Sequence, residues 1–405
     1  MTESLDSHRL GAFSHRNFRL YFGGHLVSLV GWAMHAVAQP WLVLSLTDSP
    51  FYVGVVGMLQ TAPILFLSLY GGFVADRFPR RRVLLLTQSF AMITALALAG
   101  VVFAERVLLI HVMIAATLLG VASAFDIPGR QAFLSDLVGK RDLMSAIAFN
   151  SAAFNSSRVI GPAVAGVLIG TAGVGVCFLL NGMSYLALVF ALIAMRLASS
   201  TSEPLANRSP IREGLKYVAR DRRMRALILM IAVTAVFALP FHILMPVLAR
   251  DVLGLGAAGF GWMVSATAVG ALTAALGLAV FPRHTPKGKL ILIAAPLFGV
   301  SVSALGWVPS VPLVLLLLVV VGFLQVVFTA TTNTFLQTIA RDELRGRVMS
   351  VYTVAFMGMM PIGALLGGAV AERFGVEAWF TVSGLVCAVI LFQILRMTPE
   401  IRTAA

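Results

Sequence analysis

The chain has 405 residues, of which 59% are hydrophobic and only 12% are charged. Soluble domains usually carry about 25% charged residues, so this composition excludes a water-soluble fold and indicates a protein dissolved in a lipid bilayer. The net charge of +13 is spread over many links without a patch interleaved with aromatic side chains, so we expect no nucleic-acid partner.

The N-terminal segment, residues 1–22, is polar and mixed in charge. It lacks the basic region, apolar core and cleavage site of a signal peptide, so we expect the first span to remain as an uncleaved anchor. A spanning helix needs about 20 mostly apolar residues, and prolines and glycines within it are tolerated where neighbours satisfy the backbone. The sequence predicts twelve such spans, at 18–45, 51–75, 83–104, 108–127, 143–170, 174–197, 226–249, 256–281, 289–308, 312–336, 347–371 and 376–397.

The distribution of Lys and Arg predicts how the spans are oriented. With both termini in the cytoplasm, nearly all of the 30 Lys and Arg fall on the inner side, where short loops retain them. The exceptions are Arg106, Arg250 and Arg373, expected outside, and Arg158, expected within a span. A missed or invented span would destroy this asymmetry, which supports the count of twelve.

The longest link between spans is the one stretch where the composition changes. It opens with a polar segment and continues as IREGLKYVARDRRMR, where Ile211, Leu215 and Val218 recur at helical spacing among basic residues. This pattern predicts a basic amphipathic helix on the inner membrane surface, and a calmodulin-like or nucleic-acid partner is the alternative. The predicted domains are an N-terminal six-span half, this linker and a C-terminal six-span half, at 1–197, 198–225 and 226–405.

The two halves resemble each other in sequence. Pro40 recurs as Pro246 and His35 as His242, with separations close to half of the 405 residues. Each coincidence is weak in an apolar sequence, but several nearly constant separations are harder to explain by chance. We therefore expect two parallel repeats related by an axis along the membrane normal.

The link after the second span carries a dense cluster of charge. Residues 70–88 read YGGFVADRFPRRRVLLLTQ, and one interpretation is a determinant of topology alone. The ordered pattern is more specific, and it resembles the loop 2–3 signature of the major facilitator superfamily. The residues that carry this resemblance are Gly72, Asp76, Arg77, Arg80 and Arg81.

Three further stretches, 27–50, 124–138 and 155–169, are similar to the drug- and siderophore-exporting branch of that superfamily. This branch, the transmembrane secretion effector family, includes the enterobactin exporter. The resemblance implies an all-α membrane fold of twelve transmembrane helices in two six-helix halves related by pseudo-twofold symmetry. It further implies a bacterial cell-membrane location, a substrate site between the halves near the midplane, and alternating access by rocking.

The resemblance also implies a conformational latch on the cytoplasmic side. Asp76 would face the positive N-terminus of the eleventh helix, near Arg345 and Arg347. Arg80 would meet Asp126 at the end of the fourth helix. Such a latch would hold the inner side shut while the outer side is open, and the alternative is that these are solvated loop charges.

The fifth predicted helix carries Gly161-Pro162 followed by Gly166, which is similar to a motif associated with antiporters. The fuller motif has upstream glycines that this sequence lacks. The fourth-helix arginine of proton antiporters is also not evident, because Arg130 is expected beyond the end of that helix. These departures weaken the inference of antiport without removing it.

Arg158 is the one charged residue that we expect well inside a span, where a charge is costly and normally faces a cavity or a partner. A structural bond to Asn150 or to backbone carbonyls is the alternative. No Asp or Glu is expected at mid-depth, so the candidates for proton transfer are Asp126, His35 and His242. Histidines that line the path without changing charge are the alternative.

Polar side chains alternate with Phe, Met and Trp in several spans, a lining that suits an amphipathic or lipophilic substrate better than a sugar or an inorganic ion. Arg158 and the two histidines belong to this predicted pathway. Its other polar members are Gln39, Asn155, Gln325 and Asn333.

The function that these features favour is secondary active export of a lipophilic small molecule, such as a drug, siderophore or metabolite, by proton antiport. A lipid or lysolipid flippase and a solute importer of the same fold are alternatives, and a polytopic membrane enzyme or a scaffold belongs to another class. We find no HExxH, GxSxG or phosphate-binding glycine loop, so we expect neither an enzyme nor a metal or cofactor. The expected partners are the small molecule, protons and membrane lipids, and we expect a monomer.

Overall fold

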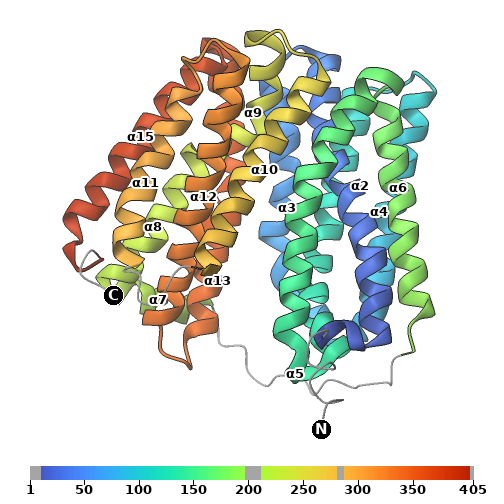
Figure 1. Cartoon of the computed structure of the whole chain (residues 1–405), viewed down its shortest axis with the longest axis horizontal. Helices are drawn as coiled ribbons and strands as arrows, with labels where there is room; N and C mark the ends of the chain where they lie inside the picture. The colour runs from blue at the N-terminus through green and yellow to red at the C-terminus, as the bar shows by residue number, and fades with distance from the viewer. Residues whose placement is uncertain (1–10, 197–210, 281–286, 402–405) are drawn as a thin grey trace. The chain divides into compact units, whose positions relative to one another are not determined.

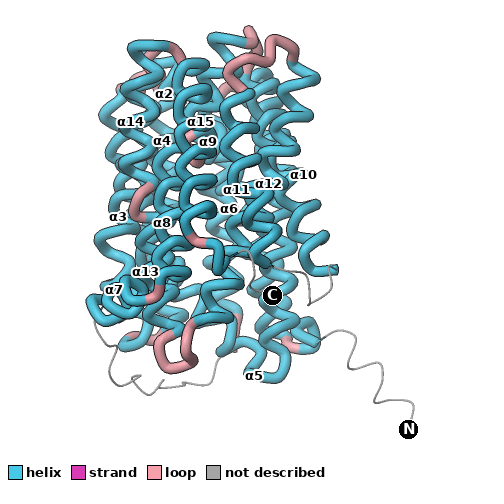
Figure 2. Tube along the Cα trace, turned by 90° about the vertical axis from the view of Figure 1, so that its left-hand side faces the viewer, coloured by secondary structure: helices cyan, strands magenta, loops and turns pink. Residues whose placement is uncertain are grey.

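The computed structural model describes residues 11–196, 211–280 and 287–401, and every regular element in this described part is a helix (Figures 1 and 2). Twelve spans are long and apolar enough to cross a membrane, which confirms the predicted all-α fold. The helices are η1 (Gly11–Ser14), α2 (Arg16–Thr47), α3 (Pro50–Arg77), α4 (Arg80–Phe103), α5 (Leu109–Ala172), α6 (Val174–Ala194), α7 (Ile211–Arg220), α8 (Arg222–Phe237), α9 (Phe241–Val247), η2 (Leu248–Val252), α10 (Ala257–Val280), α11 (Lys287–Ala304), α12 (Val311–Ile339), α13 (Arg345–Met357), α14 (Met360–Phe374), α15 (Val376–Met397) and η3 (Pro399–Ile401).

Two compact units divide the chain, one made of Met1–Leu42 with Ala62–Ala206 and the other of Val43–Thr61 with Asn207–Ala405. One division falls within the link expected at 198–225, whose first part lies outside the described residues. The assignment of Val43–Thr61 to the second unit was not expected. In the structure, the end of α2 and the start of α3 pack with the C-terminal helices. The domain boundaries drawn from the sequence therefore stay a prediction.

Glycine explains why the start of α3 packs on α14. A Cβ added to Gly54 would lie 2.4 Å from the carbonyl oxygen of Ala364, and 3.1 Å from the Cα of Gly368. A Cβ added to Gly368 would in turn meet the carbonyl oxygen of Pro50 at 2.9 Å. Without side chains at these two positions, the two backbones touch directly.

The fourth span is longer than the sequence analysis expects. Helix α5 continues to a kink at Gly139, whose φ of 68° lies in the left-handed region that favours glycine, and then resumes as the fifth span. The predicted end at 127 is wrong, and Arg130 lies inside the helix. The predicted end lies just before Pro128, but a membrane helix tolerates proline.

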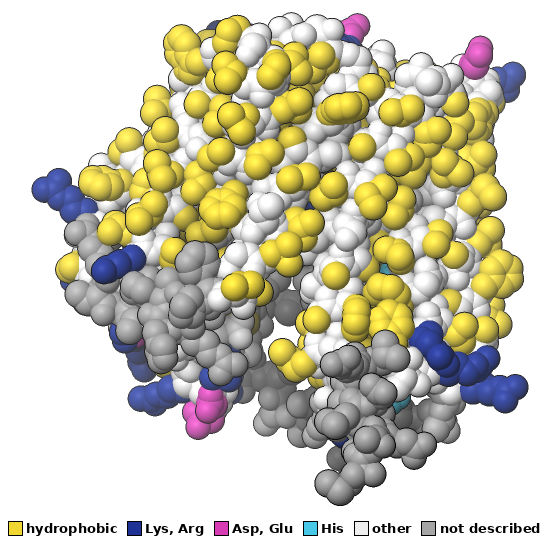
Figure 3. Space-filling view, in the orientation of Figure 1, with side chains coloured by type: hydrophobic (Ala, Val, Ile, Leu, Met, Phe, Trp, Pro, Cys, Tyr) yellow, Lys and Arg dark blue, Asp and Glu magenta, His cyan; other side chains and the backbone are white. Residues whose placement is uncertain are grey.

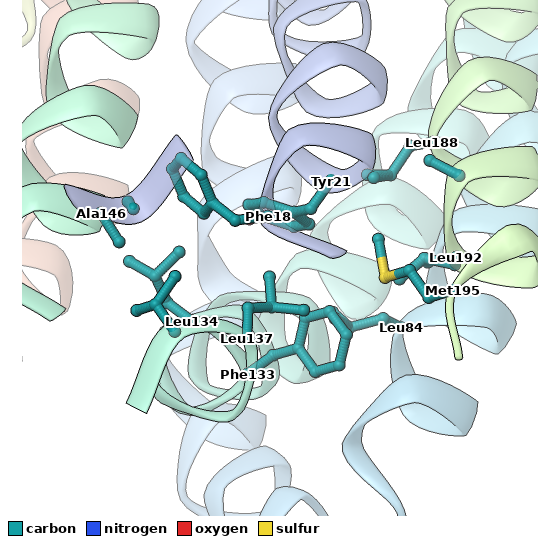
Figure 4. Close-up of a cluster of buried hydrophobic side chains, with 13 residues drawn as sticks. Phe18, Tyr21, Leu84, Phe133, Leu134, Leu137, Ala146, Leu188, Leu192 and Met195 are labelled. Carbon is teal, nitrogen blue, oxygen red and sulfur yellow. The ribbon is translucent and has the colours of Figure 1, made fainter. Parts of the chain in front are cut away.

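A cluster of buried side chains in the N-terminal unit accounts for the extra length of the fourth span. It packs the apolar residues of the α5 extension against α2, α4 and α6, so that burial continues past Pro128 (Figure 4). The buried members are Ala12, Phe18, Tyr21, Leu84, Phe133, Leu134, Leu137, Val138, Ala146, Leu188, Ala191, Leu192 and Met195.

Two spans of the C-terminal unit are interrupted. The seventh runs from α8 through α9 into the π-helical segment η2, with a break after α8 at Pro240. The eleventh is divided into α13 and α14, with Pro361 in the first turn of α14. Proline has no N–H to donate, so each break leaves backbone carbonyls available for other partners.

The predicted amphipathic helix is α7, which packs against α13. A Cβ on Gly214 would lie 2.8 Å from the carbonyl oxygen of Arg347, and Val218 is buried, whereas Leu215 is 54% exposed. The exposed leucine beside basic residues suits a membrane surface, and its placement there stays a prediction.

The surface has the composition of a protein in lipid. On the face drawn in Figure 3, hydrophobic side chains cover the flanks of the helices, and Lys, Arg, Asp and Glu side chains lie near helix ends. Several large apolar side chains are more than 60% exposed, among them Phe66, Leu86, Phe190 and Leu316. A lipid bilayer would cover this apolar surface.

The crossing of α10 and α12 gives a test of the packing. A Cβ on Gly322 would lie 2.0 Å from the carbonyl oxygen of Thr267, and one on Gly270 would lie 1.9 Å from that of Val319. We expect Gly322→Ala to destabilise the protein by about 1–3 kcal/mol, because the two backbones must separate. The measurement is thermal unfolding of purified protein in detergent.

The matched control for this test is Gly100→Ala, because a Cβ at that position meets nothing within 4 Å. A Gly-to-Ala change inside an unobstructed helix is neutral or slightly stabilising. Equal unfolding temperatures for the two variants would contradict the proposed backbone contact.

Candidate functional site

The arginines at the start of α4 are held by bonds to the N-terminal unit. Arg80 donates from Nη1 to the carboxylate of Asp136 at 2.6 Å and to the carbonyl oxygen of Ala132 at 3.1 Å. The expected contact of Arg80 with Asp126 is therefore wrong. The reason is the longer α5, since Asp136 lies about 15 Å further along the helix than Asp126, nearer the loop.

The other residues of this motif are placed as follows. Gly71 brings α3 against α5, because a Cβ there would lie 2.1 Å from the carbonyl oxygen of Ala124, and the neighbouring Gly72 is buried. Arg81 donates to the carbonyl oxygen of Ile193 at 2.9 Å. Arg77 is exposed and lies 5.8 Å from the ring centroid of Phe73.

The acidic member of the predicted latch is not placed. The side chain of Asp76 lies outside the described residues. Arg345 bonds within its own unit, to Asp342 at 2.5 Å and to the carbonyl oxygen of Gln337 at 3.1 Å, while the backbone of Arg347 packs on α7. The latch between Asp76 and the start of α13 stays a prediction.

A buried ion pair lies inside the fourth span, where the sequence analysis expected none. Asp126 and Arg130 sit one helical turn apart on α5 and pair directly, with Arg130 Nε 3.0 Å from Asp126 Oδ2. Thr87 and Gln88 of α4 donate to the other carboxylate oxygen at 3.0 and 2.7 Å. Arg130 also donates to the imidazole of His25 on α2.

This pair corrects two expectations. Arg158 is not the one charged side chain inside a span, and a carboxylate does lie within a spanning helix. The spacing of Asp126 and Arg130, four residues apart, was the available signal, because that spacing places an acid and a base on one helix face. His25 gave no comparable signal, since its contact spans 105 residues of sequence.

Arg158 lies on an aromatic surface. Its guanidinium carbon is 5.7 Å from the ring centroid of Phe154, and that ring lies 5.8 Å from the ring of Trp32 on α2. A cation over an aromatic face is attracted by the negative charge of the ring. Asn155 donates to the carbonyl oxygen of Ser151 at 2.8 Å, within its own helix.

The two matched histidines both bond to glutamines, with different geometry. His35 lies 2.7 Å from Gln39 one turn along α2, is only 2% exposed, and packs its ring 5.1 Å from that of Phe178. His242 on α9 is half-buried and lies 3.2 Å from Gln325 on α12. The predicted role of His35 or His242 in proton transfer stays a prediction.

The remaining predicted residues pack or bond locally. Asn333 accepts a bond from Gln337 at 2.7 Å on α12. A Cβ on Gly161 would lie 2.5 Å from the Cβ of Ala33, so this glycine seats the fifth span on α2. Pro162 and Gly166 are buried beside it.

The turn between α2 and α3 carries polar contacts that the sequence analysis missed. Glu372, near the end of α14, accepts hydrogen bonds from the hydroxyl of Ser49 at 2.8 Å and from the N–H of Phe51 at 3.2 Å. A carboxylate at the first turn of a helix pairs its free N–H groups and complements the positive end of its dipole. Glu372 therefore caps α3.

An arginine completes the contacts of this turn. Arg250 in η2 donates to Asp48 at 2.7 Å, to the carbonyl oxygen of Leu44 at 3.0 Å and to Asp251 at 2.6 Å. Asp48 adopts a positive φ of 50°, which few residues other than glycine adopt freely. We call these bonds, together with those of Glu372, the α2–α3 turn contacts.

These contacts can be tested by cross-linking. In a Ser49→Cys/Glu372→Cys variant with a protease site inserted between residues 198 and 210, we expect a short thiol-reactive cross-linker to keep the two fragments joined after cleavage, because the hydroxyl of Ser49 lies 2.8 Å from the carboxylate of Glu372. The measurement is non-reducing electrophoresis of membranes.

The single variant Ser49→Cys is the control, and the native Cys177 and Cys387 are both buried. Fragments of the double variant that separate after cross-linker treatment as readily as those of the control would show that Ser49 and Glu372 are not neighbours.

Comparison with known proteins places these features in a family context. A family profile described as transmembrane secretion effector matches residues 7–404. The staphyloferrin A transporter of Staphylococcus aureus is 25% identical over 95% of this chain and 97% of its own length. The multidrug efflux pump Tap of Mycolicibacterium fortuitum is 28% identical over 85% of this chain and 86% of its own. The enterobactin exporter EntS of Shigella flexneri is 25% identical, covering 97% and 96%.

Solved structures agree in fold. A mutant of the nucleoside transporter NupG superposes with a TM-score of 0.80 at 12% identity, covering 94% of this chain and all of its own. A POT family transporter bound to 5-aminolevulinic acid gives a TM-score of 0.78 at 16% identity, covering 96% and 97%. At these identities the likeness shows the fold alone, that of the major facilitator transporters.

Proposed function

The chain belongs to the transmembrane secretion effector family of major facilitator transporters, and on that premise we propose that it exports a lipophilic small molecule by proton antiport. It is a multi-pass membrane protein and a transporter. The observation that carries the export direction is that relatives aligned over most of the chain include a multidrug efflux pump and an enterobactin exporter. Drugs and siderophores are therefore the substrate classes to test first.

The proposed orientation has both termini in the cytoplasm of a bacterial cell. The arginines of the α3–α4 loop and of α7 then lie on the inner side, where short loops retain basic residues. The α2–α3 turn contacts lie on the outer side. Residues 1–197 and 226–405 act as the two rocking halves, joined by the linker 198–225.

The proposed pathway combines polar groups with aromatic surface. Arg158 over Phe154 and Trp32 offers both a cation and an apolar platform to an amphipathic molecule. His242 with Gln325 offers donors and acceptors from the C-terminal unit. Ligand sites of this kind are mostly apolar, with a few placed polar groups that fix orientation.

The function can be tested by transport into inverted membrane vesicles. We expect ethidium, a lipophilic cation, or enterobactin to accumulate in vesicles that contain the protein when the interior is made acidic, and to leak out when a protonophore collapses the gradient. Vesicles from cells without the protein are the control. Transport that runs only out of such vesicles would indicate an importer, and movement of lysolipid alone would indicate a flippase.

The latch gives a second test. We expect Asp76→Asn to abolish transport while the protein still reaches the membrane, because the amide cannot stabilise the positive helix end, an interaction worth about 0.3–1 kcal/mol and up to ~2 kcal/mol when partly buried. Glu400→Gln, at an exposed ion pair near the C-terminus, is the matched control. A variant Asp76→Asn with normal transport would remove the latch from the mechanism.

A further inference from the structure

Two cavities of the N-terminal unit lie end to end along the seam between α2 and α6. The first, which we call the head pocket, has a volume of about 580 Å³ and is lined by His15, Arg16, Asn17, Leu137 and Arg196. The second, which we call the tail groove, has a volume of about 400 Å³ and lies between residues 20–27 of α2 and 187–194 of α6. The two linings are only three residues apart on α2 and two apart at the end of α6, so the cavities are continuous along one seam.

The tail groove has an apolar lining and faces outward from the unit. Phe190 on its α6 side is 64% exposed, and Val27 on its α2 side is 49% exposed. Another face of α6, which carries Leu188 and Leu192, packs into the buried cluster (Figure 4). All side chains that line the groove are apolar, so it suits a hydrocarbon chain and gives a polar molecule no side-chain hydrogen bond.

Two adjacent glycines of α2 line this groove in different surroundings. A Cβ on Gly24 would lie 2.7 Å from the carbonyl oxygen of Ala187, so this glycine lets α2 and α6 touch. A Cβ on Gly23 would meet nothing of the described chain within 4 Å. No packing contact requires glycine at Gly23, although glycine destabilises a helix interior relative to alanine. The missing side chain of Gly23 leaves the groove open to a molecule from outside the chain.

The head pocket carries positive charge that the described residues do not neutralise. Arg16 and Arg196 are both exposed, and neither pairs with a carboxylate in the part of the chain that the structure describes. The acid bonded at this pocket is Asp142, which lies 2.9 Å from His15. Guanidinium groups bind phosphate oxygens well, because their N–H groups form a planar fork that matches the phosphate.

The corresponding arginine of the C-terminal unit does have a partner. Arg222 follows Arg16 by 206 residues, the separation of the two matched prolines, and it begins α8 as Arg16 begins α2. Its guanidinium donates to the carbonyl oxygen of Met397 at 2.5 Å and lies 3.7 Å from the carboxylate of Glu400. The N-terminal unit lacks the acid that its repeat supplies, so an anionic ligand can take that place.

We propose that the head pocket and the tail groove together bind one anionic phospholipid, with its phosphate at Arg16 and Arg196 and an acyl chain along the groove. From Arg16 to Val27, helix α2 rises by about 17 Å, close to half of the ~30 Å hydrocarbon core of a bilayer. The site therefore matches the depth of one leaflet. A zwitterionic lipid fits less well, because the two arginines repel its ammonium group. The inference concerns a lipid held on the flank of the unit and does not depend on which molecule is exported.

The groove is tested by filling it. The probe is phosphatidylglycerol, added to the purified full-length protein in detergent, and bound lipid is counted by native mass spectrometry. We expect Gly23→Leu to bind it about tenfold more weakly than wild type, because the leucine displaces CH₂ groups of the acyl chain from the groove. Binding should also raise the unfolding temperature of wild type more than that of Gly23→Leu.

The matched control for the groove is Gly100→Leu on α4. Gly100 is exposed, and a Cβ there also meets nothing within 4 Å, but it lies outside the groove. We expect this variant to bind phosphatidylglycerol as wild type does. Equal binding by the two leucine variants would overturn the proposal.

The head pocket is tested separately, which keeps the inference testable if Gly23→Leu does not fold. We expect Arg16→Gln and Arg196→Gln each to weaken phosphatidylglycerol binding by about fivefold, since each removes one cation from an anionic headgroup. Arg222→Gln, whose charge already has a partner in Glu400, is the matched control and should bind as wild type does. Equal losses in Arg16→Gln and Arg222→Gln, or equal binding of phosphatidylglycerol and phosphatidylcholine by wild type, would overturn the proposal.

Two competitors identify the occupant. Glycerophosphoglycerol has the headgroup without tails, and we expect it not to displace the lipid even in large excess. Displacement by it would indicate a site for soluble phosphate compounds and would overturn the lipid site. Diacylglycerol has the tails without the charge, and displacement by it as effective as by phosphatidylglycerol would also overturn the proposal. Failure of wild type to retain phosphatidylglycerol would show that the seam is empty or covered by the chain itself.

Discussion

A charged group inside a membrane helix has no water to stabilise it, so the protein must supply its partners, and this constraint explains the most informative contacts in the structure. Asp126 and Arg130 neutralise each other, and two helices besides their own complete the hydrogen bonds. Removing one member of a buried ion pair typically costs about 3–5 kcal/mol, because the other charge is left unpaired. The pair therefore fixes how α2, α4 and α5 meet.

Polar contacts at the α2–α3 turn are of a different kind, because they lie at helix ends and the side chain of Asp48 is exposed. Arg250 and Glu372 there bond to backbone groups and to side chains of the turn, and glycines let α3 and α14 approach closely. Interactions of this kind are strong enough to hold one arrangement and weak enough to exchange, since a partly exposed ion pair contributes about 0–1 kcal/mol. A transporter that alternates between two states needs contacts of such strength at the ends of its helices.

The sequence predicted the spans well, because a run of about 20 apolar residues is a strong signal and its alternatives in lipid are few. It failed at the fourth span, which was predicted to end at 127, because the burial of Phe133 and Leu137 depends on helices elsewhere in the chain. Proline is a weaker signal in a membrane helix than in a soluble one.

The site was predicted less completely than the fold, for a physical reason. The motif around Arg80 is local and was recognised, but its partner Asp136 depended on the length of α5. The bond between Ser49 and Glu372 joins residues 323 apart, and no pattern in a single sequence reports such a pairing. The spacing of Asp126 and Arg130 was visible, but the predicted end of the helix at 127 placed Arg130 beyond it.

The account depends on the buried pair of Asp126 and Arg130 fixing how α2, α4 and α5 meet. The most direct measurement is the unfolding of the purified protein in detergent with Asp126→Asn, which leaves Arg130 without its counter-charge, beside Asp142→Asn at the partly exposed pair with His15. We expect Asp126→Asn to destabilise the protein by about 3–5 kcal/mol and Asp142→Asn by about 0–1 kcal/mol. Equal losses of stability in the two variants would contradict the account.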